Sequence, residues 1–295
     1  MSFSIFRPLV SFAIVAVLSV PALADRALQP ARSSDRANSA LRTALVIGNA
    51  HYKESPLANP ANDARDMART LRELGFDVTE LIDANQKAMK QAVSGFGNKL
   101  RRGGTGVFYY AGHGIQVKGG NYLVPVDMQI KSESEVEYEA VDVGFVLAQM
   151  EDAKNPLNIV ILDACRNNPF PRATRSAARG LAQMNAPTGT FIAYATAPGS
   201  VAADGQGKNG LYTQELLRAM KQPGLGVEEM FKQVRIAVKG KSGNQQVPWD
   251  SSSLTGHFSF ARGDSTLGTS ARPVASEPDK ASAANDDERR WLNER

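Results

Sequence analysis

Cys165 and His113 are the residues of this chain whose types and spacing best suit covalent chemistry. Cys165 is the only cysteine, and it follows the apolar run 157–161 in the segment Leu-Asp-Ala-Cys at 162–165. A second apolar run, 107–110, leads into Ala-Gly-His-Gly at 111–114. Such runs are typical of buried parallel strands, whose carboxyl ends meet at one edge of a sheet. We therefore expect a thiol and an imidazole side by side at that edge.

The chemistry that this pair could perform is nucleophilic attack by sulfur. A thiol with the ordinary pKa of about 8.5 is only slightly ionised at neutral pH, so Cys165 needs a base beside it. His113 can take the thiol proton and later give it to a departing amine. The alternatives are a buried cysteine that acts as a small hydrophobic residue and a flexible turn with a surface histidine. The occurrence of both motifs in one chain favours the catalytic interpretation.

The motifs around these residues resemble those of the caspase-like cysteine peptidases, in particular the paracaspase and bacterial metacaspase-like branch. They are Tyr-Tyr-Ala-Gly-His-Gly at 109–114, Val-Pro-Val-Asp at 124–127 and Leu-Asp-Ala-Cys-Arg-Asn at 162–167, and the histidine precedes the cysteine by 52 residues. The resemblance runs from about Arg42 to Ala261. It implies peptide hydrolysis through a thioester on Cys165, with the N–H groups of Gly114 and Cys165 as the oxyanion hole.

The pattern of the chain between residues 42 and 262 predicts one catalytic domain of the α/β class. Strand and helix patterns alternate there, which indicates a caspase-like sandwich of a mostly parallel sheet with helices on both faces. The expected strands are near 43–48, 76–81, 107–114, 157–165, 189–196 and 257–260, the last at an edge. The expected helices are near 60–74, 86–100, 141–150, 212–220 and 227–238.

Residues 1–24 have the pattern of a secretory signal peptide. They contain a single basic residue, a mostly apolar run from 9 to 20 and the ending Ala-Leu-Ala. An uncleaved membrane anchor is the alternative. Residues 25–41 are expected to form a polar linker and residues 263–295 a disordered tail. The expected location is the periplasm or the cell exterior, with no stable membrane insertion once the signal is removed.

The charge balance and the remaining motifs exclude several kinds of partner. Without residues 1–24 the chain carries 33 basic and 30 acidic residues, which is too balanced to indicate a nucleic acid partner. The sequence has no CxxC, HExxH or phosphate loop, so no metal site or cofactor is expected, although a calcium requirement, as in some metacaspases, stays open. His51 and His257 lack a second ligand type at metal spacing, and we expect structural roles for both.

Two aspartates suggest a preference for basic side chains in a substrate. Asp163 lies two residues before Cys165, so both side chains of a strand would point to one side of the sheet. A carboxylate beside a buried cleft is costly unless a cation such as a substrate Arg or Lys compensates it. The resemblance implies a second pocket aspartate at Asp63, with Asp66 and an ordinary helix-start carboxylate as alternatives. The third acidic position of the family falls near the apolar Val201.

These observations predict a cysteine endopeptidase that cleaves proteins or peptides after Arg or Lys. A catalytically weak caspase-like module for peptide binding or scaffolding is the alternative, because a fold does not establish an activity. A doubly wound small-molecule-binding protein would need a phosphate loop or glycine fingerprint, which the chain lacks. The segment 166–181 contains four arginines and is either a self-cleavage site or a solvated basic loop.

Overall fold

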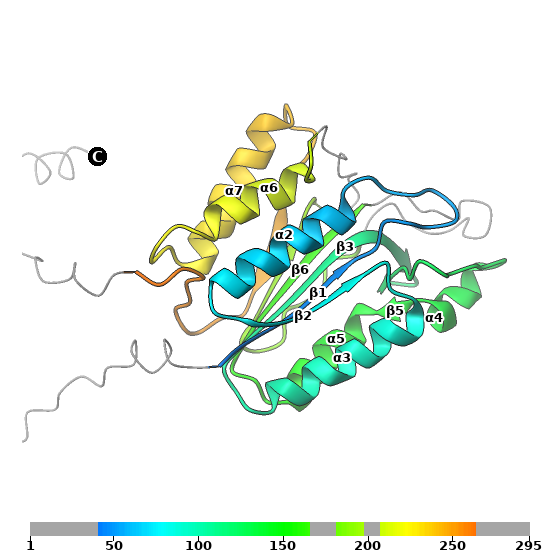
Figure 1. The fold of residues 1–295 in the computed structure, drawn as a ribbon, viewed down its shortest axis with the longest axis horizontal. Helices are drawn as coiled ribbons and strands as arrows, with labels where there is room; N and C mark the ends of the chain where they lie inside the picture. Colours follow the sequence, from blue (N-terminus) through cyan, green and yellow to red (C-terminus); the bar gives the residue numbers. More distant parts are fainter. Residues whose placement is uncertain (1–40, 166–180, 198–206, 264–295) are drawn as a thin grey trace, which may run out of the picture.

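A computed structural model describes residues 41–165, 181–197 and 207–263, which form an α/β structure (Figure 1). These residues contain an eight-stranded sheet whose main path has the order β2-β1-β3-β6-β7-β8. Pairing along this path is parallel except between β7 and β8. The predicted α/β class, with a mostly parallel sheet and helices on both faces, is therefore confirmed.

The strands and helices have the following bounds. The strands are β1 (Arg42–Gly48), β2 (Asp77–Ile82), β3 (Thr105–Val117), β4 (Gly120–Leu123), β5 (Val141–Asp142), β6 (Leu157–Cys165), β7 (Thr190–Tyr194) and β8 (Trp249–Ser252). The helices are α2 (Pro60–Glu73), α3 (Gln86–Leu100), a short 3₁₀ turn η1 (Glu133–Glu135), α4 (Val136–Glu139), α5 (Val143–Asp152), α6 (Leu211–Ala219) and α7 (Val227–Lys241).

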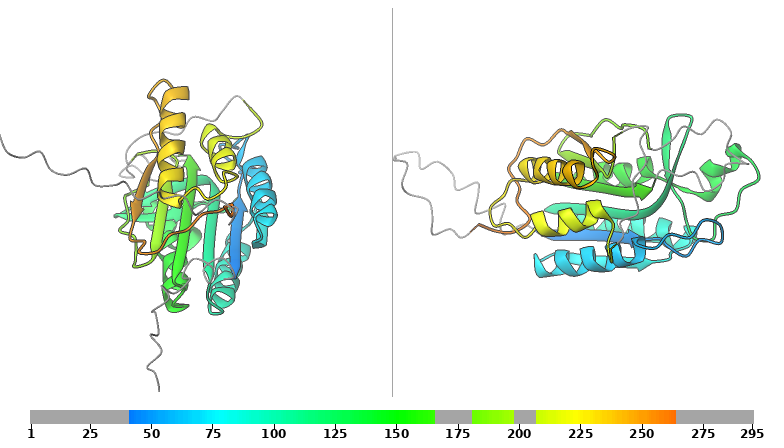
Figure 2. Two further views of the ribbon diagram at one scale, coloured as in Figure 1. Left: turned by 90° about the vertical axis from the view of Figure 1, so that its left-hand side faces the viewer. Right: turned by 90° about the horizontal axis from the view of Figure 1, so that it is seen from above.

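The helices form two layers that bury both faces of the sheet. Helices α2, α6 and α7 cover one face, and α3 and α5 cover the other (Figures 1 and 2). Alternate residues of β3 reach the two layers, since Tyr109 lies in the core with α2 and α6 whereas Phe108 and Tyr110 lie in the core with α3 and α5. A strand that is buried on both faces reads as a continuous apolar run. This is why the central strands could be predicted.

Strand β3 extends beyond the end of its neighbour and carries a small antiparallel sheet. Its pairing with β6 ends at His113, and its pairing with β4 begins at the next residue, Gly114. Strand β5 then pairs with β4. The extension has an apolar core of its own, which includes Tyr52 and Val124. His113 consequently lies where β3 leaves the main sheet.

The predicted strand at 257–260 is wrong. The edge strand is β8, which pairs with β7 through polar residues such as Ser251 and Ser252 and has no apolar alternation that would reveal it. In 257–260, Phe258 and Phe260 are buried in the core with α7, and Ser259 makes only an isolated bridge to Gly226. The apolar alternation of this segment therefore reflects packing against helices.

Several predictions concern residues outside the described ranges. The signal at 1–24, nearly all of the linker, the tail from 264 and most of the basic segment 166–181 fall there, as does Val201. Within the described ranges, no helix has the length and apolar character needed to cross a bilayer.

Arg42, the first residue of β1, binds the segment around Phe260 near the C-terminal end of the domain. Its buried guanidinium donates to the carbonyl oxygens of Phe260 at 2.6 Å and Leu74 at 3.1 Å. It also lies 5.4 Å from the ring centroids of Phe76 and Phe258. Planar guanidinium groups suit such combined stacking and carbonyl binding better than a lysine ammonium does.

Replacing Arg42 by Met should lower the free energy of unfolding by about 3 kcal/mol, because it leaves buried carbonyl oxygens without a donor. Urea unfolding followed by circular dichroism measures this loss. Arg72→Met is a matched control, since Arg72 forms a surface ion pair with Glu80 at 2.9 Å. Its loss should cost less than about 1 kcal/mol. Equal stabilities of the Arg42 variant and the wild type would contradict this role of Arg42.

Candidate active site

The pairing of β3 with β6 brings the two predicted catalytic positions together. The strands run in register from Thr105 opposite Leu157 to His113 opposite Cys165. His113 and Cys165 are therefore backbone neighbours at the carboxyl edge of the sheet, as the sequence motifs predicted. Gly114, whose N–H is predicted to belong to the oxyanion hole, is the next residue of β3 after His113.

The imidazole of His113 is buried and held in a defined tautomer. Its side chain belongs to a residue that is 1% exposed, and Nε2 lies 2.7 Å from the carbonyl oxygen of Ser55. A carbonyl oxygen only accepts, so we assign the proton of the neutral ring to Nε2. Nδ1 is then the basic nitrogen. The ring of Tyr52 packs against the imidazole at a centroid distance of 4.5 Å.

Two tyrosines also hold the backbone of His113. The His113 N–H donates to the hydroxyl of Tyr52 at 3.0 Å, and the hydroxyl of Tyr110 donates to the His113 carbonyl oxygen at 2.8 Å. Gly112 makes this possible, because a Cβ there would lie 2.6 Å from both hydroxyl oxygens. Its φ of +153° also lies in a region that residues with side chains rarely adopt. Glycine at 112 thus leaves room for the two phenols.

The two predicted pocket aspartates meet on the face covered by α2 and α6. Asp63 lies in the first turn of α2 and is 3% exposed, while Asp163 lies near the end of β6. The Gly210 N–H donates to Asp63 Oδ1 at 3.0 Å. A Cβ at Gly210 would lie 3.2 Å from Asp63 Oδ2 and 3.9 Å from Asp163 Oδ2. The two carboxylates therefore approach the same face of Gly210, and we call them the acidic pair.

Two hydroxyl groups, from Thr213 and Tyr109, form a hydrogen-bonded chain that ends on the carboxylate of Asp163. Thr213 Oγ1 donates to Asp163 Oδ2 at 2.6 Å, and the Tyr109 hydroxyl lies 2.5 Å from the same Oγ1. Since the threonine proton is directed to the carboxylate, the tyrosine donates to the threonine. Burial, reinforced by the charges of the acidic pair, raises the pKa of Tyr109 well above its ordinary value. Tyr109 therefore stays protonated and remains a donor.

The surroundings of the acidic pair disfavour two negative charges. Burial and the neighbouring Asp163 carboxylate raise the pKa of Asp63 to about 8, against the opposing effect of hydrogen bonds from Asn209 and Gly210. Burial and a like charge both favour the protonated form of a carboxyl group. The pair therefore retains a proton at neutral pH, and a cation placed between the two groups would favour its release.

Asp66, the alternative to Asp63, has its charge compensated by neighbouring cations. It forms ion pairs with Lys208 at 2.9 Å and with Arg69. Burial raises the pKa of Asp66, but hydrogen bonds from Lys208, Asn209 and Arg69 outweigh this effect and bring the pKa below its ordinary value. The structure thus brings Asp63, rather than Asp66, to Asp163.

The other predicted residues are placed as follows. A Cβ at Gly114 would lie 2.9 Å from Leu181 and 3.0 Å from Ala164, so the glycine is needed for close packing. His51 pairs with Asp83, and His257 lies exposed near the C-terminal end of the described chain. Across 41–165, 181–197 and 207–263, no group of three or more His, Cys, Asp or Glu residues is placed to hold a metal ion.

Sequence reasoning missed the residues that support the site. Tyr110 belongs to the histidine motif, which could have indicated its role. The hydroxyl of Tyr52, however, accepts a hydrogen bond from the N–H of His113 across a separation of 61 residues. Gly210 and Thr213 contact the acidic pair across separations of 147 and 50 residues. Local patterns carry no signal for contacts of this kind.

Comparison with known proteins identifies the family. A family model described as the caspase domain matches residues 41–259. This chain belongs to the caspase domain family. This match confirms the caspase-like resemblance of the motifs. Caspase domains are a family of cysteine peptidases, so the predicted class of protein is confirmed as well.

Two curated proteins and one solved structure are also similar to this chain. The chain is 37% identical over 126 residues to the human "Mucosa-associated lymphoid tissue lymphoma translocation protein 1", and the mouse homolog gives the same figures. The match covers 42% of this chain but only 15% of the length of these relatives. The fold is similar to the crystal structure of the Drosophila initiator caspase Dronc, with a TM-score of 0.55, 15% identity and coverage of 74% of this chain and 82% of that one.

Proposed function

We propose that this caspase-domain protein is a cysteine endopeptidase that cleaves peptide bonds after Arg or Lys. The observation that carries the proposal is the acidic pair, in which Asp63 on α2 is buried and Asp163 on β6 is half-buried, beside the His113 and Cys165 positions. The pair supplies excess negative charge at the place where a peptidase of this family would bind the side chain before the scissile bond. The domain bounds proposed for the enzyme are 42–262.

The proposed reaction uses Cys165 as nucleophile and His113 as general base and acid. The thiolate attacks the carbonyl carbon, and the N–H groups of Gly114 and Cys165 stabilise the oxyanion of the tetrahedral intermediate. The intermediate collapses to a thioester as the protonated imidazole gives its proton to the leaving amine. Water, deprotonated by His113, then hydrolyses the thioester. The Nε2 contact with Ser55 supports this scheme because it leaves Nδ1 for proton transfer.

The proposed specificity follows from the charge of the acidic pair. A guanidinium or ammonium group that enters between Asp63 and Asp163 replaces the repulsion of two carboxylates by two attractive contacts. The Asp side chain of a substrate would add a third negative charge. This arrangement favours Arg and Lys and disfavours Asp before the scissile bond.

A fluorogenic peptide assay tests the activity itself. Peptides that differ only in Arg, Lys, Asp or Leu before the fluorophore should be cleaved in the order of their positive charge. The scaffold alternative predicts binding of the Arg peptide without release of the fluorophore. We propose no metal or cofactor for the reaction. Assays with calcium and with a chelator would establish whether calcium is required.

The proposed location is the periplasm or the cell exterior. The apolar run and Ala-Leu-Ala ending at 1–24 support removal of a signal, after which we propose no stable membrane insertion. Protein or peptide substrates are the proposed partners, and the charge balance supports no role for nucleic acid.

The acidic pair predicts a rise in kcat/KM for an Arg peptide as the pH increases through about 8. The fully ionised pair binds a cation best, and the pKa of Asp63 is raised to about 8. At neutral pH, below this raised pKa, most molecules of free enzyme would hold the proton, and kcat/KM reports ionisations of the free enzyme. In an Asp63→Asn variant this rise in kcat/KM should be absent, because the asparagine side chain does not ionise. Stopped assays from pH 6 to 9.5 with both proteins give the comparison.

The same proton affects stability and provides an independent check. The pKa of Asp63 is about 8 in the folded state, above the value near 4 expected when the chain is unfolded. Its contribution to stability is therefore fully present below about pH 4 and is lost as the pH rises through about 8. The stability of the wild type relative to Asp63→Asn should fall over this window. A constant difference in urea unfolding would show that Asp63 titrates normally.

A further inference from the structure

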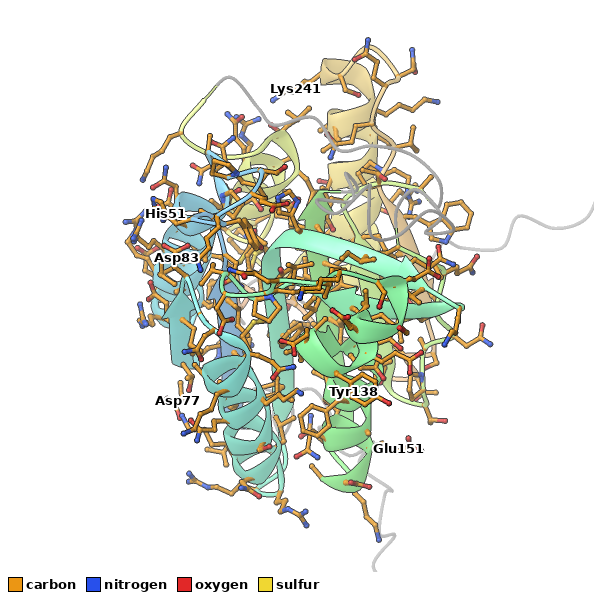
Figure 3. The ribbon with its side chains drawn as sticks, turned by 90° about the vertical axis from the view of Figure 1, so that its right-hand side faces the viewer. His51, Asp77, Asp83, Tyr138, Glu151 and Lys241 are labelled. Carbon is orange, nitrogen blue, oxygen red and sulfur yellow. The ribbon has the colours of Figure 1, made fainter. Side chains whose placement is uncertain are left out.

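Asp83 is a carboxylate outside the acidic pair that lies beside the segment in contact with His113. It follows β2 directly, and Figure 3 shows it next to His51. Its Oδ1 accepts the N–H groups of Ala50 at 2.8 Å and His51 at 2.9 Å. Its Oδ2 lies 2.6 Å from Nδ1 of His51. One carboxylate thus binds two consecutive backbone N–H groups and the side chain of the second residue.

The segment that Asp83 holds, residues 50–55, makes the contacts that orient His113. The Leu57 N–H donates to the Ala50 carbonyl oxygen at 2.9 Å, which closes the loop just beyond this segment. Tyr52 packs on the imidazole and accepts the His113 N–H, and Ser55 accepts from Nε2. Both the ring position and the tautomer of His113 therefore depend on where segment 50–55 lies.

Tyr52 is packed in the core of the β3 extension, whereas the residues that follow it, Lys53, Glu54 and Ser55, are exposed. A cavity of about 430 Å³ borders it, lined by Tyr52, Lys53 and Glu54 and by residues between 126 and 135. Ser55 has a left-handed backbone, with φ of +54°, which is unfavourable for a residue with a side chain. Ala50 is 2% exposed, so its N–H would lose its acceptor with little access to water if the carboxylate were removed.

We propose that Asp83 is a positioning residue that acts on His113 through segment 50–55. Its carboxylate contacts Ala50 and His51 rather than the imidazole of His113. Its two backbone hydrogen bonds fix the start of the segment, and the segment fixes the imidazole. This inference rests on the proposed catalytic role of His113. Displacement of a catalytic group by about 1 Å can reduce a rate roughly 100-fold.

Asp83 stays ionised over the range in which a peptidase would be assayed. Burial raises its pKa, but hydrogen bonds from the N–H groups of His51 and Ala50 and the contact with the His51 ring outweigh that effect. The pKa of Asp83 therefore lies below its ordinary value. A change in the pH profile of a variant would consequently report His113 and Cys165 rather than the titration of Asp83.

Three variants of the full chain test the proposal. Asp83→Gly removes the carboxylate but suits the local φ of +52°, which reduces the risk that the protein fails to fold. Asp83→Asn keeps an oxygen acceptor and also tolerates this backbone. Asp77→Asn is the matched control, because Asp77 begins the strand that Asp83 follows, has a side chain that is 64% exposed and pairs with Lys99. Figure 3 shows Asp77 well apart from Asp83 and His51.

The kinetic expectation is a loss in kcat with little change in KM. Asp83→Gly should lower kcat roughly 10- to 100-fold, with KM within about threefold of the wild type, because the substrate pocket is untouched. Asp83→Asn should recover most of the activity, and Asp77→Asn should match the wild type. The kcat and KM values for one Arg peptide give this comparison.

Alkylation of Cys165 by iodoacetamide gives a second readout that needs no peptidase activity. The apparent pKa of the thiol should rise toward about 8.5 in Asp83→Gly, since a displaced imidazolium no longer stabilises the thiolate. A merely structural role would lower the unfolding midpoint without moving this profile. If the wild type cleaves no peptide, the proposed function fails while the alkylation profile still tests Asp83. Wild-type kcat and a wild-type alkylation profile in Asp83→Gly would overturn the inference.

Discussion

Replacement of Cys165 by Ala, or of His113 by Ala, should reduce peptide hydrolysis by a factor of roughly 10⁴ or more, because nucleophile and base act as a unit. Each variant should keep its fold, which circular dichroism and urea unfolding would verify. Iodoacetamide should add one adduct to the wild type and none to Cys165→Ala, since the chain contains a single cysteine. Intact mass measures the adduct.

His257→Ala is the matched control for the histidine variant. His257 is exposed and lies on the segment after β8, so its loss should leave hydrolysis unchanged. Full activity in Cys165→Ala would contradict the thiol mechanism. Equal losses in the His113 and His257 variants would mean that histidine at 113 has no particular role.

The second large effect concerns the side chain before the scissile bond. A peptide library should show cleavage after Arg and Lys and none after Asp. Asp163→Asn should lower kcat/KM for an Arg peptide by roughly tenfold to hundredfold, which corresponds to a charge-assisted contact of about 1.5–3 kcal/mol. The expected loss arises because the neutral amide cannot compensate the guanidinium charge.

Asp66→Asn separates the acidic pair from its acidic neighbour. The charge of Asp66 is compensated by Lys208 and Arg69, so its loss should change kcat/KM by less than about threefold. A library profile led by Asp or by apolar residues would refute the assignment of Asp63 and Asp163 to the pocket.

The sequence predicted the centre of the fold better than its edges. Strands β1, β3 and β6 are buried on both faces, and their uninterrupted apolar runs made them visible. Strand β8 has the sequence Trp-Asp-Ser-Ser and pairs on one side only, so its residues need not be apolar. The segment 257–260 alternates because Phe258 and Phe260 pack on the core, a pattern that mimics a strand.

The site was predictable where residues lie on motifs and not where the fold assembles supports. His113 and Cys165 follow from two strand-end motifs, and Asp163 from its spacing to Cys165. Tyr52 and Asp83 act through contacts that only the three-dimensional structure creates, such as the 33-residue separation between Ala50 and Asp83. Chain patterns with periods of two or 3.6 residues cannot encode such distances.

The acidic pair and the groups that donate hydrogen bonds to it come from three parts of the chain that are far apart in sequence. These are the start of α2, the end of β6 and the residues around the start of α6. No such arrangement persists when the chain unfolds, so a small guanidinium or ammonium compound that occupies it binds the native state alone. At a concentration 100 times its Kd, such a ligand adds about 2.7 kcal/mol to the unfolding free energy. For a domain of this size each kcal/mol raises Tm by about 2–4 °C. Thermal melting above pH 8 would therefore rank cationic ligands of this pocket before any natural substrate is known.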